Sequence, residues 1–187
     1  MSSPADAPRA ATREALEPRV IENPVSGERI VIHRSAADTG GELLAFDLLL
    51  PTGCHVPGAH IHPAQQERFT VVRGRMRFRL GRRTVIAGPG ETVSIPPGTR
   101  HWFGNAGAGT AELRVEVRPA MRMQELFERS EAMGRAGGLF GTRLPRPADF
   151  AAFLLEFEAE LAVVKAPALL LRLLLRPIAR LAGRRPR

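Results

Sequence analysis

Short apolar stretches alternate with turn residues over residues 20–118 of the chain. Within residues 69–80, apolar side chains and arginines alternate with a period of two, which is typical of a strand with one buried and one solvated face. We expect the buried face of this run to carry four side chains: Val72, Met76, Phe78 and Leu80. Residues 112–118 alternate in the same way, and Gly- and Pro-containing turns separate the runs. Many short strands at this spacing predict a mainly β domain, either a sandwich or a barrel.

Helical patterns replace the alternation after Pro119. Three helices are predicted, over residues 121–133, 148–165 and 167–182, and Pro177 interrupts the last of them. Gly and Pro are frequent between the first two helices, so residues 134–147 are predicted to be a linker. The acidic side chains of the second helix would pair with the arginines of the third if the two helices fold back antiparallel.

Positive charge is concentrated at the C-terminus. The chain carries a net charge of +8, and residues 166–187 contain six arginines and no acidic residue. The remainder is therefore close to neutral, which argues against a nucleic-acid-binding domain. Uncharged stretches in this tail are much shorter than the roughly 20 residues of a membrane span. A helical hairpin is the favoured interpretation, while an interfacial membrane helix and packing onto a second subunit stay open.

The N-terminal residues 1–19 are rich in Ser, Ala and Pro and contain no apolar stretch, so we expect a disordered leader and not a secretory signal. Cys54 is the single cysteine, which excludes an intramolecular disulfide and is consistent with a reducing, cytoplasmic location. Cys54 itself is expected to be a small buried apolar side chain.

Three imidazoles and one carboxylate carry the chemistry of the sequence: His60, His62, Glu67 and His101. His60 and His62 are two residues apart on an expected strand, so their side chains point to one face. His101 follows a Pro-Pro-Gly turn that fixes the backbone before it. At these spacings the four side chains can close around one divalent ion, and imidazole nitrogen with carboxylate oxygen suits Fe, Mn, Ni, Co, Cu or Zn.

Other polar and aromatic residues near this set have less specific roles. His33 is expected on a strand face, His55 in a solvated loop, and Trp102 and Phe103 in the core. Metal-bound imidazoles need hydrogen-bond partners that fix their tautomer. Three nearby residues are candidates for that role: Gln66, Arg68 and Asn105.

The residues around the four side chains resemble the two motifs of the single-domain cupins. The first motif is His-x-His, four residues, Glu, six residues, Gly, and it matches His60, His62, Glu67 and Gly74. The second motif is Gly, five residues, Pro-x-Gly, two residues, His, three residues, Asn. Its counterparts here are Gly90, Pro96, Gly98, His101 and Asn105. One spacing departs from the pattern, because six residues separate Gly53 from His60 where five are usual.

This resemblance covers residues 40–118 and implies a cupin jelly-roll, or double-stranded β-helix barrel, with a C-terminal α-helical extension. It implies that His60, His62, Glu67 and His101 are the ligands of one divalent transition metal ion and that the protein is a homodimer. With its helical segment the chain resembles a group of bacterial cupin-domain proteins. The resulting division is a leader (1–19), a barrel (20–118), a helix and linker (119–147) and a helical hairpin with a basic tail (148–187).

Cupins perform many reactions, so the fold alone does not select one. The leading expectation is a metal-dependent dioxygenase of the quercetin-oxygenase type that acts on a small organic molecule, with Glu67 as the catalytic base. One alternative is an O₂-independent isomerase or cyclase that uses the ion as a Lewis acid. A second alternative is a module that binds a small ligand without catalysis.

Overall fold

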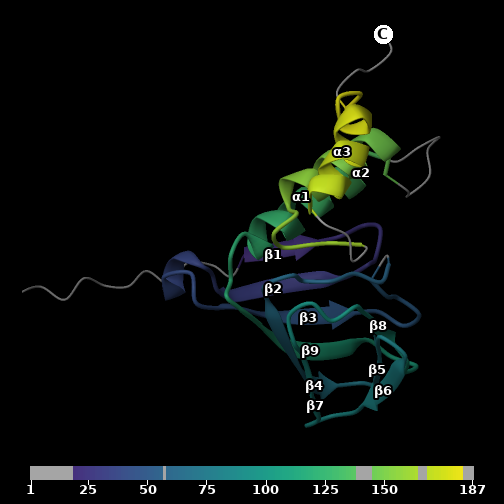
Figure 1. Ribbon diagram of the computed structural model, residues 1–187. Coiled ribbons are helices and arrows are strands. Elements are labelled where there is room, and N and C mark those ends of the chain that lie inside the picture. The colour runs from purple at the N-terminus through teal and green to yellow at the C-terminus, as the bar shows by residue number, and fades with distance from the viewer. Residues whose placement is uncertain (1–18, 57, 138–144, 164–167, 183–187) are drawn as a thin grey trace, which may run out of the picture.

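The computed structural model describes residues 19–56, 58–137, 145–163 and 168–182 (Figure 1). Strands come first and α-helices last, in the order β1 (Arg19–Glu22), β2 (Arg29–Arg34), η1 (Ala37–Thr39), β3 (Leu44–Leu50), β4 (Gln66–Arg73), β5 (Met76–Leu80), β6 (Arg83–Ala87), β7 (Thr92–Ile95), β8 (His101–Asn105), β9 (Ala111–Arg118), α1 (Met123–Arg135), α2 (Pro147–Glu156) and α3 (Ala168–Ala179). This mainly β architecture with a C-terminal helical part confirms the predicted fold class.

The strands form two antiparallel sheets. The larger sheet has the order β1-β2-β3-β9-β4-β7 and the smaller sheet the order β6-β5-β8. Strand β9 pairs with both β3 and β4, which are far from it in sequence, so the two halves of the larger sheet are joined by long-range contacts. Leu113, Val115 and Val117 of β9 are fully buried, as the alternation in the sequence predicts.

Aromatic side chains join the two sheets. Phe69 of β4 lies 5.4 Å from Phe78 of β5 and 4.9 Å from Phe103 of β8, measured between ring centroids. All three rings are buried, and tilted aromatic pairs at this distance add to the stabilisation from burial. The core therefore lies between the sheets, and β4 and β8, which carry two of the candidate ligands, are fixed by it.

Residues 69–80 form a hairpin instead of the single strand that the alternation suggests. Gly74 adopts a φ of +89° and turns the chain between β4 and β5. The turn changes which alternate residues face the core. Phe69 and Val71 are therefore the buried apolar side chains of β4, while Val72 is 47% exposed. The prediction that Val72 faces the core is therefore wrong, although Met76 and Phe78 are buried as expected.

The helices gather beside the β1 edge of the larger sheet (Figure 1). Helix α1 covers the sheet, with Phe127 at 5.4 Å from Phe46 of β3 in an edge-to-face contact. Helix α3 packs against α2, and Arg172 of α3 forms an ion pair with Glu158 just after α2. One ion pair of the kind expected between the acidic side chains of the second helical segment and the arginines of the third is therefore present.

The second helix is much shorter than the sequence pattern suggests. It ends at Glu156 and not near residue 165, because Phe157 leaves the helical conformation with φ of −113° and ψ of 30°. The backbone of Ala162 then pairs with Ile61 as an isolated β-bridge. The expected leader up to residue 18, half of the expected linker (138–144) and the end of the basic tail lie outside the described residues.

Candidate metal centre

Four side chains meet at one point between the two sheets. One ligand atom from each of His60, His62, Glu67 and His101 lies within 4.8 Å of the other three, and no other such cluster occurs in the described part of the chain. His60 and His62 come from the loop before β4, Glu67 from β4 and His101 from β8. Three of the side chains are buried and His60 is half-buried. The four predicted ligands are therefore brought together.

Backbone hydrogen bonds hold the two ligand-bearing segments in register. The N–H of His60 donates to the carbonyl of His101 at 2.9 Å, and the N–H of His101 donates to the carbonyl of His60 at 2.8 Å. Gly98 of the turn before β8 donates to the carbonyl of His62 at 2.8 Å. The position of each imidazole therefore depends on strand pairing, and the Pro-Pro-Gly turn adds a direct contact.

Each imidazole points one nitrogen at a backbone carbonyl. The Nδ1 atoms of His60 and His101 lie 3.0 Å from the carbonyl oxygens of Gly58 and Thr99, respectively. The Nδ1 atom of His62 lies 2.5 Å from the carbonyl oxygen of Glu160. Because a carbonyl only accepts, Nδ1 carries the proton in all three rings. When a ring is neutral, its Nε2 keeps a lone pair, which is the form that binds a metal, and any second proton would sit on Nε2.

The buried atoms at the centre fit a cation. His101 Nε2 lies 2.9 Å from Glu67 Oε2, and His62 Nε2 lies 3.4 Å from Glu67 Oε1. Glu67 Oε2 and His101 Nε2 are buried, and neither has a hydrogen bond of normal geometry. Buried polar atoms are rarely left unsatisfied, so this pair points to a bound ion that both atoms contact. Three nitrogens and one carboxylate oxygen suit a divalent transition metal.

The titratable groups of the cluster have pKa values that are shifted in different directions. Burial, with the neighbouring imidazoles, lowers the pKa of His60 to about 4. Burial also disfavours a charge on His62, but the Glu67 carboxylate outweighs burial and raises the His62 pKa above its ordinary 6.5. Burial opposes ionisation of Glu67 as well, yet attraction to His62 and the close approach of the His62 and His101 nitrogens hold its pKa far below the usual range. Glu67 is therefore a carboxylate, and His62 carries the proton that a metal must displace.

Metal affinity is therefore expected to fall as the pH drops through the His62 pKa. The fall should be about tenfold per pH unit, because one proton competes with the ion. His60 has a pKa of about 4 and contributes no proton near neutrality. Calorimetric titration with Zn²⁺ at pH 6.5, in two buffers of different ionisation enthalpy, should show release of about one proton per ion. An affinity that does not change with pH around 6.5 would contradict this assignment.

The C-terminal segment takes part in the centre, which the sequence analysis did not anticipate. Ile61 exchanges two backbone hydrogen bonds with Ala162, at 2.8 Å and 2.9 Å. Glu160 supplies the carbonyl that fixes His62, and its own carboxylate accepts from the N–H of Arg122 at 3.3 Å. These bonds explain why residues 160–162 do not continue a helix. No motif marks these residues, because they act through backbone groups.

The side chains proposed as hydrogen-bond partners of the imidazoles do not have that role. Gln66 and Arg68 are exposed on β4. Asn105 donates to the carbonyls of Leu50 and Gly109, both at 2.8 Å, and so fixes the end of β8. Backbone carbonyls orient the imidazoles instead. The neighbouring Gln65 is buried and donates to the carbonyls of Pro119 and Ala120, which ties the start of β4 to the chain after β9.

The remaining candidates stay outside the centre. His33 lies on a strand face and its Nε2 is 2.7 Å from Asp47 Oδ2. His55 is exposed and lies 5.4 Å from the ring of Trp102, which is half-buried. Cys54 is a partly buried free thiol that packs against the core. None of the three joins the ligand cluster of the described residues.

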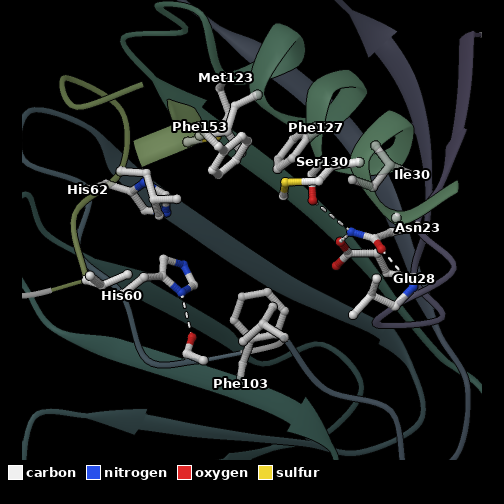
Figure 2. A pocket seen from close by; sticks show the side chains of 18 of the residues that line it. Asn23, Glu28, Ile30, His60, His62, Phe103, Met123, Phe127, Ser130 and Phe153 are labelled. Carbon is white, nitrogen blue, oxygen red and sulfur yellow. Dashed lines mark hydrogen bonds between the residues drawn. The ribbon is translucent and has the colours of Figure 1, made fainter. Parts of the chain in front are cut away.

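A cavity of about 620 Å³ opens from the centre into the space between sheet and helices. Figure 2 shows His60 and His62 on one side of it and Asn23, Glu28 and Ser130 on the other. Most of its wall is apolar and comes from β2, β3, β4, β8, α1, α2 and the segment after α2. Phe103 lines it as well as filling the core. A small molecule in this cavity would contact the metal ligands directly.

Comparison with known proteins finds similar solved structures and one matching family model. No match was found among curated proteins. Similar solved structures include the Cnp3 cupin domain of Schizosaccharomyces pombe (12% identity, 66% of this chain, 79% of that chain, TM-score 0.48). They also include a predicted oxalate decarboxylase of Thermotoga maritima (20% identity, 59% and 99%, TM-score 0.48). A third is a sugar phosphate isomerase of Silicibacter pomeroyi (21% identity, 50% and 60%, TM-score 0.44).

The family model that matches is described as the cupin domain, and it covers residues 46–117. The matched residues begin within β3 and end within β9, so they include both motifs and all the strands between them. Three of the four candidate ligands could not have been placed by strand pattern alone, since they lie at strand ends or in a loop. Residues 46–117 therefore match the cupin domain, and the His/Glu cluster in and around this part is positioned to hold a metal ion.

Proposed function

We propose that the protein is a mononuclear metal-dependent dioxygenase that acts on a small, largely apolar organic molecule. One observation carries this proposal: the His₃Glu cluster opens directly into a cavity with an apolar wall. Four protein ligands leave one or two positions of a six-coordinate ion free for substrate and O₂. Because O₂ is itself apolar, a dry apolar cavity suits it as a co-substrate.

The wall of the cavity also restricts the substrate. None of the described residues that line it is a lysine or an arginine. Phosphorylated and polyanionic substrates are usually bound by such cations, often through paired hydrogen bonds. Aromatic and aliphatic side chains instead favour an aromatic or alkyl skeleton. Sugar phosphates and small dicarboxylic acids are therefore poor candidates compared with flavonol-like or β-diketone-like molecules.

The residues of the centre have separate roles in this proposal. His60, His62, Glu67 and His101 hold the ion, which supplies a site where substrate oxygens and O₂ meet. Glu67 is ionised and buried, so it is also placed to accept the hydroxyl proton of an enol or phenol that enters the cavity. The apolar wall excludes water from the oxidised substrate.

Oxygen uptake tests the proposal. Protein loaded with Fe²⁺, Mn²⁺ or Ni²⁺ is incubated with a flavonol or a β-diketone, with and without O₂, and one O₂ is expected to disappear per substrate consumed. Glu67→Gln should lower turnover by at least about 100-fold, the usual contribution of a general base. Turnover without O₂ would favour the isomerase or cyclase alternative. Metal-dependent binding of these molecules without any turnover would favour a non-catalytic module, and either result would overturn the dioxygenase.

A further inference from the structure

A polar cluster lies across the cavity from the metal ligands (Figure 2). Asn23 follows β1, Glu28 precedes β2 and Ser130 belongs to α1. The Asn23 amide donates to Ser130 Oγ at 3.0 Å and to Glu28 Oε1 at 3.4 Å. Its carbonyl oxygen accepts from the N–H of Val25 at 2.9 Å. Asn23 is therefore fully engaged, and it holds the other two side chains in place.

Glu28 and Ser130 retain hydrogen-bonding capacity toward the cavity that both line. A carboxylate accepts up to about four hydrogen bonds, and Asn23 and Ser26 take up at most two of them at Glu28. Ser130 accepts from Asn23, and no hydrogen bond donated by its hydroxyl is seen within the described ranges. Both residues are half-buried and line the mostly apolar cavity.

Burial raises the pKa of the Glu28 carboxyl, although interactions with the Ser26 hydroxyl and the Asn23 amide oppose this shift. A carboxyl group in such a place is poorly solvated, so a hydrogen-bond donor on a ligand would stabilise its charged form. Between this cluster and the metal ligands the wall is aromatic and aliphatic, with Phe103, Phe127 and Phe153 among its members. The two polar ends are thus separated by an apolar middle.

We infer that Glu28 and Ser130 recognise the far end of an elongated ligand. The ligand class has metal-binding oxygen atoms at one end, an apolar body, and a hydrogen-bond donor, a hydroxyl or an ammonium group, at the other. This inference rests on the proposed function for the metal end only. The hydrogen-bond donor at the other end of the ligand is inferred from the geometry of Asn23, Glu28 and Ser130. All three residues lie outside the part of the chain that the cupin domain model matches.

Hydroxamic acids test this inference, because they bind metals through two oxygens. Zn²⁺-loaded protein is titrated calorimetrically with octanohydroxamic acid and with its ω-hydroxy and ω-amino derivatives. At least one derivative should bind about tenfold more tightly than the parent, which corresponds to one hydrogen bond to a buried carboxylate. Glu28→Leu should abolish the preference, and Ser130→Ala should reduce it. Glu22→Leu, which changes an exposed acid of β1, should leave it unchanged.

The outcomes separate the two claims. If all three hydroxamates bind equally tightly and only with Zn²⁺, binding of the ligand to the metal ion is supported and the Glu28 inference is overturned. If Glu28→Leu keeps the preference, the donor is recognised elsewhere and the inference also fails. If none of the three binds better with Zn²⁺ than without it, the proposed function is contradicted, because it requires the ligand to bind the metal ion.

A separate observation concerns the outer face of α3. Six large apolar side chains of α3 and the turn after it have exposed fractions between 40% and 69%. They are Leu169, Leu170, Leu173, Leu174, Ile178 and Leu181. The opposite side of the helix packs against the protein through Leu175. Helix α3 therefore packs against α2 and leaves an apolar face without a partner among the described residues. Apolar patches of this kind on a soluble domain mark an interaction surface.

Charge identifies the partner of the α3 face. In the sequence of residues 166–187, arginines alternate with these apolar residues and follow them, and no acidic residue occurs. Arg176 and Arg180 are exposed beside them. A second copy docked symmetrically on this face would bring two such basic segments together. An anionic lipid surface instead complements both the apolar side chains and the arginines. None of the described helices is long and apolar enough to cross a bilayer.

We propose that α3 lies in the surface of an anionic membrane, with its apolar face in the lipid. The full chain should sediment with phosphatidylglycerol vesicles, and added salt should weaken the association. Vesicles of phosphatidylcholine should bind it much less. Replacing Leu173 and Leu174 together with Gln should lower partitioning by at least about tenfold, since each buried apolar side chain contributes roughly 1.5 kcal/mol or more. Val72→Gln, at an exposed apolar position on β4, is the matched control.

Three results would overturn this proposal. The protein could stay in the supernatant with phosphatidylglycerol vesicles. The double variant could bind as well as the parent chain. Analytical ultracentrifugation could show a dimer that the double variant loses, in which case a second copy covers the α3 face.

Discussion

Replacing His62 with Ala is expected to lower the affinity of the protein for Zn²⁺ by more than about 100-fold. Loss of a hydrogen-bond partner of a metal ligand costs roughly 10- to 100-fold in affinity, and loss of the ligand itself should cost more. His62 is 5% exposed and its Nε2 lies 3.4 Å from Glu67 Oε1, so water has little room to replace it without rearrangement. Competition against a chelating dye measures the change.

His55→Ala is the matched control for this prediction. His55 is five residues from the cluster in sequence but exposed and absent from it, so its removal should leave the affinity within about threefold. Circular dichroism of both variants shows whether the barrel remains folded. Equal affinities of the His62 and His55 variants would mean that the ion is bound elsewhere or not held by this cluster.

The second large effect is expected at Gly74, where Ala should destabilise the protein by about 3 kcal/mol. The φ of Gly74 is +89°, a conformation that costs an L-residue roughly 1–2 kcal/mol. A Cβ atom at this position would also lie 2.8 Å from the Cα atom of Ala111 in β9. Since that neighbour is backbone within the central sheet, it cannot move aside without disturbing strand pairing. Denaturant unfolding monitored by circular dichroism measures the loss.

Gly90 separates the two causes. Its φ of +83° is similar, but a Cβ there has no neighbour within 4 Å. Gly90→Ala should therefore cost only the backbone contribution, about 1 kcal/mol. Equal losses at both glycines would show that backbone conformation alone accounts for the loss at Gly74 and that the contact with Ala111 adds nothing.

Spacing and alternation predicted the parts of the fold that depend on local pattern. His60 and His62 lie in a loop and not on the expected strand, so it was the spacing of the two motifs, and not a strand pattern, that predicted the ligand cluster. The period of two in β9 correctly placed its buried side chains. It failed at Val72 because a glycine turn shifts the parity between β4 and β5, and a simple alternation does not register such a shift.

Long-range backbone contacts could not be predicted from the sequence. Glu160 and Ala162 continue a helical pattern, yet their backbone groups bond to the ligand loop, and tertiary pairing there outweighs helix propensity. The same applies to the cavity, whose polar far end combines a turn after β1, the start of β2 and a helix after the barrel. No spacing rule brings Asn23 and Ser130, which are 107 residues apart, to one hydrogen bond.

Anomalous diffraction from crystals soaked in Zn²⁺ tests the central claim most directly. We predict one strong peak per chain, bonded to Nε2 of His60, His62 and His101 and to a carboxylate oxygen of Glu67, at about 2.0–2.2 Å from each. A peak at other side chains, or crystals that bind no ion while the four side chains keep their positions, would contradict the account.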